Sequence, residues 1–159
     1  MSKSMGRTKD QVLGEICYAQ RLAQRTARLY RRIQAFSTVV AIVGGAGVVS
    51  ALADRFPAWV PVGGAALMAV FGAMVIAIRP ADKAVPNELD VRKYDELLAR
   101  AQGLPVEQIL PLLAEARKTD AAEIESLRVI AYNDVMSEIN RDDQKIRPTP
   151  YQVLLEAIA

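Results

Sequence analysis

The sequence predicts an all-α protein in which a two-span transmembrane helical hairpin joins an N-terminal amphipathic helix to cytoplasmic C-terminal helices. Two blocks, residues 33–53 and 56–78, contain none of the 18 acidic and 20 basic residues of the chain, and they are 21 and 23 residues long. About 20 apolar residues in a helix cross the roughly 30 Å of membrane hydrocarbon. No segment shows the alternation of polar and apolar residues that is typical of strands.

Two other interpretations fit these blocks less well. A soluble buried hairpin would need further apolar faces to cover it, whereas the rest of the chain is strongly charged. A cleaved signal peptide would end at Ala51-Leu52-Ala53, but the polar region before the first block is 32 residues long, and a second apolar block follows almost at once.

The segment before the first block predicts a flexible tail, residues 1–9, followed by a basic helix. From Asp10 onward, apolar residues recur at helical spacing, and another face carries a stripe of arginines. No proline or cap separates this helix from the first block, so we expect one continuous helix. The predicted domains are this tail, residues 10–80 with the basic helix and both spans, and the cytoplasmic helical region of residues 81–159.

A tight connection and a second span, about residues 57–78, follow the first span. The second span opens with prolines and a tryptophan, which suit a first helical turn and the membrane interface, and it closes at Arg79-Pro80. Eight basic residues precede the first span, whereas only Arg55 lies in the connection. The positive-inside bias therefore predicts a multi-pass protein of the bacterial inner membrane with both termini in the cytoplasm.

The C-terminal region predicts further helices. Asn87 is expected to be the N-cap of the first of them. Pro111 or Asp120 is expected to break the next helical region, and Asp120 has the sequence pattern of a helix start. Thr149, between two prolines, precedes a short apolar helix, residues 151–158, which should dock on another surface.

Composition argues against catalysis. The chain has no histidine and one cysteine, Cys17, which excludes zinc chemistry of the usual kind and nucleophile–histidine pairs. No cofactor fingerprint is present. We therefore expect no enzyme, no catalytic residue, no metal site and no cofactor.

Small residues in both spans predict close helix packing. They are Gly44 and Gly47 in the first span and Ala65, Ala69, Ala73 and Ala77 in the second. Such surfaces fit packing of the hairpin on itself and packing between subunits equally well.

One side of the first span is polar near the cytoplasm and small or apolar further out. Its residues are Gln34, Ser37, Thr38, Ala41, Gly45 and Val48. In an oligomer this side would line a pore with an apolar constriction. Hydrogen bonding between helices is the alternative use of the same residues.

A second set of residues is expected at the membrane surface: Arg21, Arg25, Arg28, Arg32, Trp59 and Arg79. Because the arginine stripe lies just before a span, anionic headgroups are its nearest polyanion, and we expect no nucleic-acid partner. Pairing of the basic N-terminal helix with the C-terminal region is a further alternative, since residues 1–32 have a net charge of +6 and residues 79–159 have a net charge of −4.

The layout resembles the SLATT superfamily of bacterial two-transmembrane effector domains. The resemblance covers roughly residues 10–140 and includes Arg92-Lys93-Tyr94 and Ala131-Tyr132-Asn133-Asp134 in the C-terminal helices. It implies a membrane-perturbing effector of bacterial conflict systems, such as those directed against phages, that forms pores and depolarises the membrane. We expect no fused sensor domain, and the resemblance then implies a trigger that comes from a partner or binds to these helices.

The sequence therefore predicts an oligomeric, pore-forming membrane effector, because two spans cannot enclose a pore. Its expected partners are the lipid bilayer, further copies of the chain and a soluble sensor or activating partner. The rival interpretation is a non-conducting scaffold that docks a soluble partner, which is favoured by the lack of charge within the spans.

Overall fold

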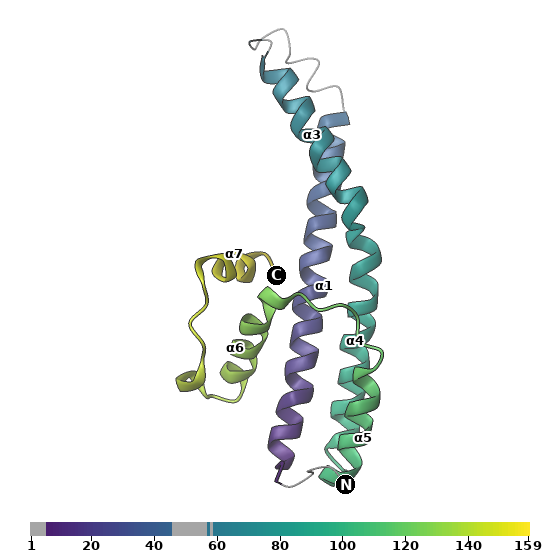
Figure 1. The fold of residues 1–159 in the computed structure, drawn as a ribbon, viewed down its shortest axis with the longest axis vertical. Coiled ribbons are helices and arrows are strands. Elements are labelled where there is room, and N and C mark those ends of the chain that lie inside the picture. The colour runs from purple at the N-terminus through teal and green to yellow at the C-terminus, as the bar shows by residue number, and fades with distance from the viewer. Residues whose placement is uncertain (1–5, 46–56, 58) are drawn as a thin grey trace. The chain divides into compact units, whose positions relative to one another are not determined.

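The computed structural model describes residues 6–45, 57 and 59–159 of the 159-residue chain. Within these ranges the protein is all-α and contains no strand, which confirms the predicted class. The six helices of these described ranges, drawn in Figure 1, are α1 (Lys9–Gly45), α3 (Trp59–Ile78), α4 (Pro80–Ala101), α5 (Val106–Arg117), α6 (Arg128–Glu138) and α7 (Pro150–Ile158). Two short 3₁₀ helices, Glu125–Leu127 and Asp142–Gln144, flank α6.

The helices form two compact units. The charged unit consists of Met1–Leu29 and Lys83–Ala159, and the apolar unit consists of Tyr30–Asp82. The first part of α1 thus groups with the C-terminal helices, although the sequence pattern joins it to the spans.

Helix α1 confirms the predicted continuity of the basic helix into the first apolar block as far as Gly45. It begins after Thr8, whose hydroxyl accepts a hydrogen bond from the Gln11 backbone N–H (3.3 Å). The Gln11 side chain in turn accepts one from the Thr8 N–H (3.0 Å). This reciprocal capping box defines the helix start. The rest of the predicted first span, residues 46–53, lies outside the described residues.

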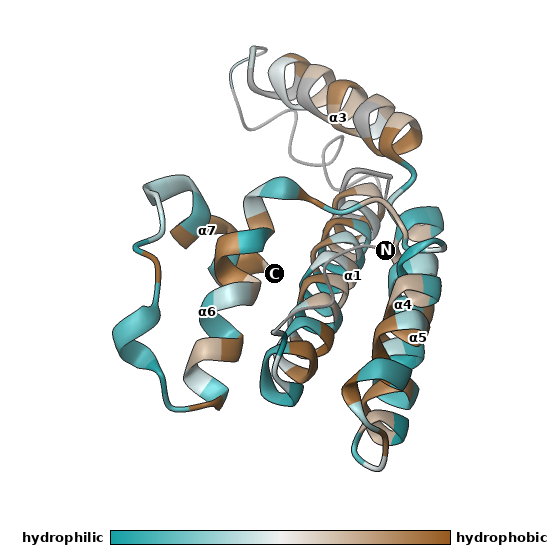
Figure 2. Ribbon diagram, turned by 60° about the horizontal axis from the view of Figure 1, so that its bottom comes forward, coloured by the Kyte–Doolittle hydropathy of each residue, from teal (hydrophilic) through white to brown (hydrophobic). Residues whose placement is uncertain are grey.

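The charged unit has an apolar core between α1, α4 and α5, which lie side by side in Figures 1 and 2. Residues one helical turn apart supply it: Val12 and Ile16 from α1, Tyr94, Leu97 and Ala101 from α4, and Ile109 and Leu113 from α5. On the other side of α1 lie α6 and α7. Their buried residues include Ile130, Ala131, Val135 and Leu155.

Two expected helix starts are wrong. Helix α4 begins at Pro80 rather than at Asn87, because a proline in the first turn loses no helical hydrogen bond. Asn87 lies buried about two turns into the helix, where its side chain donates to the Lys83 carbonyl (2.8 Å). Asp120 lies in the non-helical segment 118–124, and α5 passes through Pro111 without a break.

Helix α3 ends at Ile78, as predicted, and Arg79 adopts a left-handed conformation (φ 49°) before α4 begins. Proline at position 80 disfavours the right-handed helical conformation at Arg79. Among the residues that the structure describes, no single helix has the length and apolar composition of a membrane span. Val62–Ile78 and Pro80–Ala101 meet the two criteria for a membrane span only when they are taken together, as a helix pair that is bent by 40°.

Helix α7 confirms the predicted short apolar helix. The Thr149 hydroxyl accepts from the Gln152 N–H (3.3 Å), and the Gln152 side chain accepts from the Thr149 N–H (2.9 Å). Replacing Thr149 with alanine should destabilise α7 by about 1 kcal/mol, because the Gln152 N–H loses its partner. Hydrogen exchange of the α7 amides measures this loss. Thr149→Ser, which keeps the hydroxyl, should exchange like the wild type, and equal rates in the alanine variant would contradict the cap.

Candidate functional site

The expected pore-lining side of α1 is only partly exposed. Gln34 and Ser37 are half-buried, whereas Thr38 and Ala41 are exposed. The hydroxyls of Ser37 and Thr38 donate to carbonyls one turn earlier, at Ile33 and at Gln34. Their oxygen lone pairs remain able to accept from water or to bind a cation. Gly45 is the last residue of α1, and Val48 lies outside the described residues.

Helix α3 packs on α1 with a different face from the one that carries the small residues. The packing face contains Met68, Phe71 and Val75, which are half-buried at helical spacing, and the Phe71 ring meets the Phe36 ring edge to face with centroids 5.4 Å apart. All four alanines of the predicted ridge, Ala65, Ala69, Ala73 and Ala77, are exposed. In the described part of the hairpin, this ridge is therefore not buried against α1. Gly44 lies within α1, and Gly47 lies outside the described residues.

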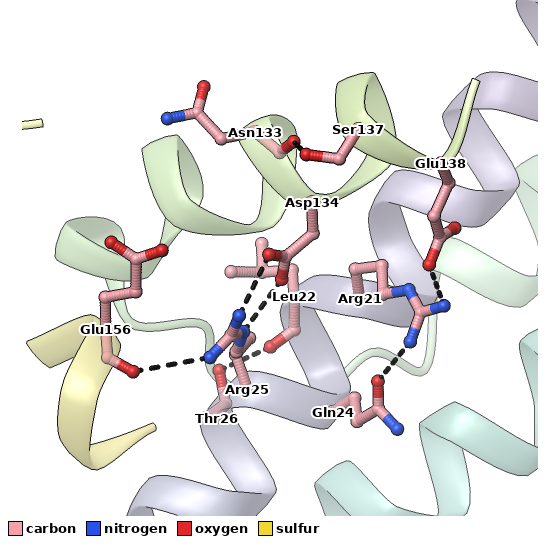
Figure 3. Close-up of polar contacts among 10 residues, drawn as sticks. All are labelled: Arg21, Leu22, Gln24, Arg25, Thr26, Asn133, Asp134, Ser137, Glu138 and Glu156. Atoms are coloured by element: carbon pink, nitrogen blue, oxygen red, sulfur yellow. Dashed lines mark hydrogen bonds and ion pairs between the residues drawn. The ribbon is translucent and has the colours of Figure 1, made fainter. Parts of the chain in front are cut away.

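Two arginines of the stripe, Arg21 and Arg25, pair with α6 inside the charged unit (Figure 3). The Arg25 guanidinium donates from two nitrogens to the two carboxylate oxygens of Asp134, at 2.8 and 2.9 Å, and to the Glu156 carbonyl of α7 at 3.4 Å. Arg21 pairs with Glu138 and donates to the Gln24 side chain at 2.7 Å. The hydrogen bond to Asp134 raises the pKa of Arg25 above its ordinary value.

The spacing of these four residues aligns the two helices. Arg21 and Arg25 are one turn apart on α1, and Asp134 and Glu138 are one turn apart on α6, so the two pairs form only when the helices run in opposite directions. We call this contact the arginine clamp. A bidentate arginine–carboxylate pair with less than a quarter of either side chain exposed is worth more than an ordinary surface pair. The matching four-residue spacings are the sequence signal that could have identified Asp134 and Glu138 as partners.

The clamp leaves one donor without a partner. The Nε of Arg21 is buried and has no hydrogen-bond partner, although the same guanidinium donates from its two other nitrogens. A buried N–H that is not satisfied costs free energy. Docking of α6 therefore leaves one N–H donor of the Arg21 guanidinium without a hydrogen bond.

The other expected membrane-surface residues are exposed. Arg28, Arg32 and Arg79 are exposed, and Trp59 at the start of α3 has 75% of its surface accessible. Arg21 and Arg25 of the arginine stripe thus pair with carboxylates of the same chain. Binding of the remaining members to a membrane surface stays a prediction.

A second polar cluster, which sequence patterns did not predict, anchors the 118–124 segment to α4. The Lys93 ammonium donates to Asp90 and to Asp120, both at 2.7 Å, and the Tyr94 hydroxyl donates to Asp120 at 2.6 Å. Asp90 also accepts from the Ala121 backbone N–H at 2.7 Å. Asp120 is therefore used in tertiary contacts, which explains why it does not cap a helix.

Burial and then the hydrogen bond to Asp120 raise the pKa of Tyr94 above its ordinary value. Because the folded pKa exceeds the unfolded one, Tyr94 should contribute full stability below about pH 10 and lose it as the pH rises beyond that value. Thermal unfolding at pH 8 to 11 should show this alkaline decrease, and Tyr94→Phe should make it smaller. An identical decrease in both proteins would contradict the prediction.

An open groove of about 430 Å³ lies beside this cluster and includes Tyr18, Arg117 and Arg128 in its lining. Both arginines are already paired, Arg117 with Glu15 (3.0 Å) and Arg128 with Glu123 (3.1 Å). These carboxylates offset the positive charge of the groove, so it offers little attraction to an anionic ligand. Among the described residues, no three carboxylate or thiol side chains gather closely enough to hold a metal ion.

Comparisons of the chain with protein-family models, with curated proteins and with solved structures found no match.

Proposed function

We propose that the chain is an oligomeric two-span protein of the bacterial inner membrane that permeabilises the membrane under regulation. In this proposal residues 33–53 and 57–78 cross the bilayer, and both termini are cytoplasmic. Residues 9–29 and 83–159 form a cytoplasmic assembly and control region. The resemblance to SLATT effectors supports a role in bacterial conflict, including defence against phages.

The surface of α3 is the observation that carries the proposal. Its large apolar side chains Trp59, Val62, Val70 and Ile76 each have 66% or more of their surface exposed, and the helix contains no charged residue. A surface of this kind is unfavourable in water and favourable in lipid or against other subunits.

The exposed alanine ridge supports assembly. In a bilayer, helices associate through small residues that let backbones approach closely. Because the ridge of α3 does not face α1, it is free to pack against another copy. One hairpin cannot enclose an aqueous path, so permeation requires several copies, about four or more.

A scaffold is the second candidate function. It is favoured by exposed apolar side chains at helical spacing on α7, at Tyr151, Leu154 and Ile158, and by exposed Ile146 in the segment before this helix. In that case the hairpin anchors the protein, and these residues bind a soluble partner without transport.

The subunit count of the purified chain in mild detergent separates the two functions. Light scattering with the detergent mass subtracted should give at least four copies for a pore. A clean monomer or dimer would contradict the pore and favour the scaffold.

A further inference from the structure

The α6 and α7 helices make a separable layer of the charged unit. The buried apolar cluster that joins α1, α4 and α5 contains no residue of α6 or α7. These two helices lie against the opposite side of α1, as Figures 1 and 2 show, and their contacts with it include the arginine clamp. Loss of this layer would leave the apolar core of the unit in place.

We propose that α6 and α7 form an autoinhibitory cover on α1, held in place by the arginine clamp. This inference rests on the proposed pore, in which several copies of α1 surround one axis. One side of α1 packs on α4 and α5, and around Arg21 and Arg25 the other side is occupied by the cover. Release of the cover therefore opens a further face of α1, through which the copies of an assembled oligomer can rearrange into the conducting state.

Apolar side chains such as Ile130 and Val135 of α6 are buried in this layer, and the arginine clamp is its polar part, where release can begin. The side chains of Arg21 and Glu138 are 30% and 44% exposed, so water and salt reach this pair and screen it. The buried Nε of Arg21 has no partner while the cover is docked and can bind water once the cover leaves. Both features reduce the free energy that release requires.

The polar cluster on α4 defines where the cover hinges. Lys93 and Tyr94 hold Asp120, and Asp90 holds the Ala121 N–H, at the start of the segment that leads to α6. Residues 122–124 follow without helical structure. Release of the clamp therefore frees α6 and α7 while the chain stays attached to the core at Asp120.

Charge reversal at the clamp tests the cover. Asp134→Arg places two arginines against each other, and the double variant Arg25→Glu with Asp134→Arg restores an opposite-charge pair. Asp143→Arg makes the same change of charge at a side chain that is 69% exposed. Asp134→Asn removes the charge and keeps the side-chain shape, and it replaces Asp134→Arg should that variant not fold by circular dichroism.

Two quantities are measured on the full chain: hydrogen exchange of the α6 amides in detergent, and potassium flux from liposomes. In Asp134→Arg we expect exchange and flux to rise about tenfold or more, since a hydrogen-bonded charge pair is lost. The α4 and α5 amides should keep their protection. The double variant should return both quantities to wild-type values, and Asp143→Arg should leave them unchanged.

Two results in Asp134→Arg would overturn the autoinhibitory role. One is faster exchange of the α6 amides with unchanged flux and unchanged subunit count, and the other is unchanged exchange of these amides. A third outcome separates the cover from the pore. Faster exchange with a higher subunit count, but with liposomes that stay sealed for every variant, would keep the cover as a brake on assembly and would overturn permeation.

Discussion

Replacing Val70 with arginine should lower the ratio of membrane-integrated to non-integrated protein about a hundredfold. Val70 lies near the middle of α3 with 66% of its surface exposed. An arginine at the centre of a membrane span costs about 2.5–3.5 kcal/mol, whereas an exposed helical position in water accepts it within about 0.5 kcal/mol. The substitution therefore distinguishes a span from a soluble helix, which the length of α3 alone does not.

Resistance of the protein to extraction from membranes at alkaline pH measures this ratio. Val85→Arg is the matched control, because Val85 is also exposed but lies in α4, beyond the predicted span. It should integrate like the wild type. Equal integration of the Val70 and Val85 variants would contradict the assignment of α3 as a span.

Replacing Asp120 with alanine should destabilise the charged unit by about 2–3 kcal/mol, because the change removes two hydrogen bonds that involve a charged group. The Tyr94 hydroxyl loses its acceptor, and the Lys93 ammonium keeps Asp90 as a partner. The 118–124 segment also loses one of its attachments to α4. Hydrogen exchange of the α4 amides in detergent should therefore accelerate.

Glu123→Ala is the control for this prediction. Glu123 lies on the same 118–124 segment, and it forms an exposed ion pair with Arg128 of α6. Such pairs contribute about 0–1 kcal/mol, so the control should change exchange little. Equal effects of the two substitutions would contradict the anchoring role of Asp120.

Local patterns predicted the elements that depend on local chemistry. The start of the basic helix near Asp10, the end of α3 before Arg79-Pro80 and the short helix after Thr149 all follow from periodicity, proline and capping residues. The expected cap at Asn87 is wrong. In the sequence, Pro80 and Pro86 look like part of a linker that breaks helices, whereas α4 begins at Pro80 and continues through Pro86.

Long-range contacts were beyond local patterns. Nothing near Val12 or Ile16 indicates that they pack against Tyr94, some 80 residues later. The charge difference between the chain ends indicated an attraction, but it did not identify Arg25 and Asp134 as the bidentate pair. The candidate site therefore depends on tertiary contacts that only the folded chain brings together.

Potassium flux from liposomes that contain the purified chain tests the central claim most directly. We predict low flux for the wild type and about tenfold or higher flux for Asp134→Arg. Adding Ala41→Glu to that variant should shift the flux toward cation selectivity, because a ring of negative charge then lines the path. Ala41→Gln should leave selectivity unchanged. Sealed liposomes for every variant, at a subunit count of four or more, would contradict the account.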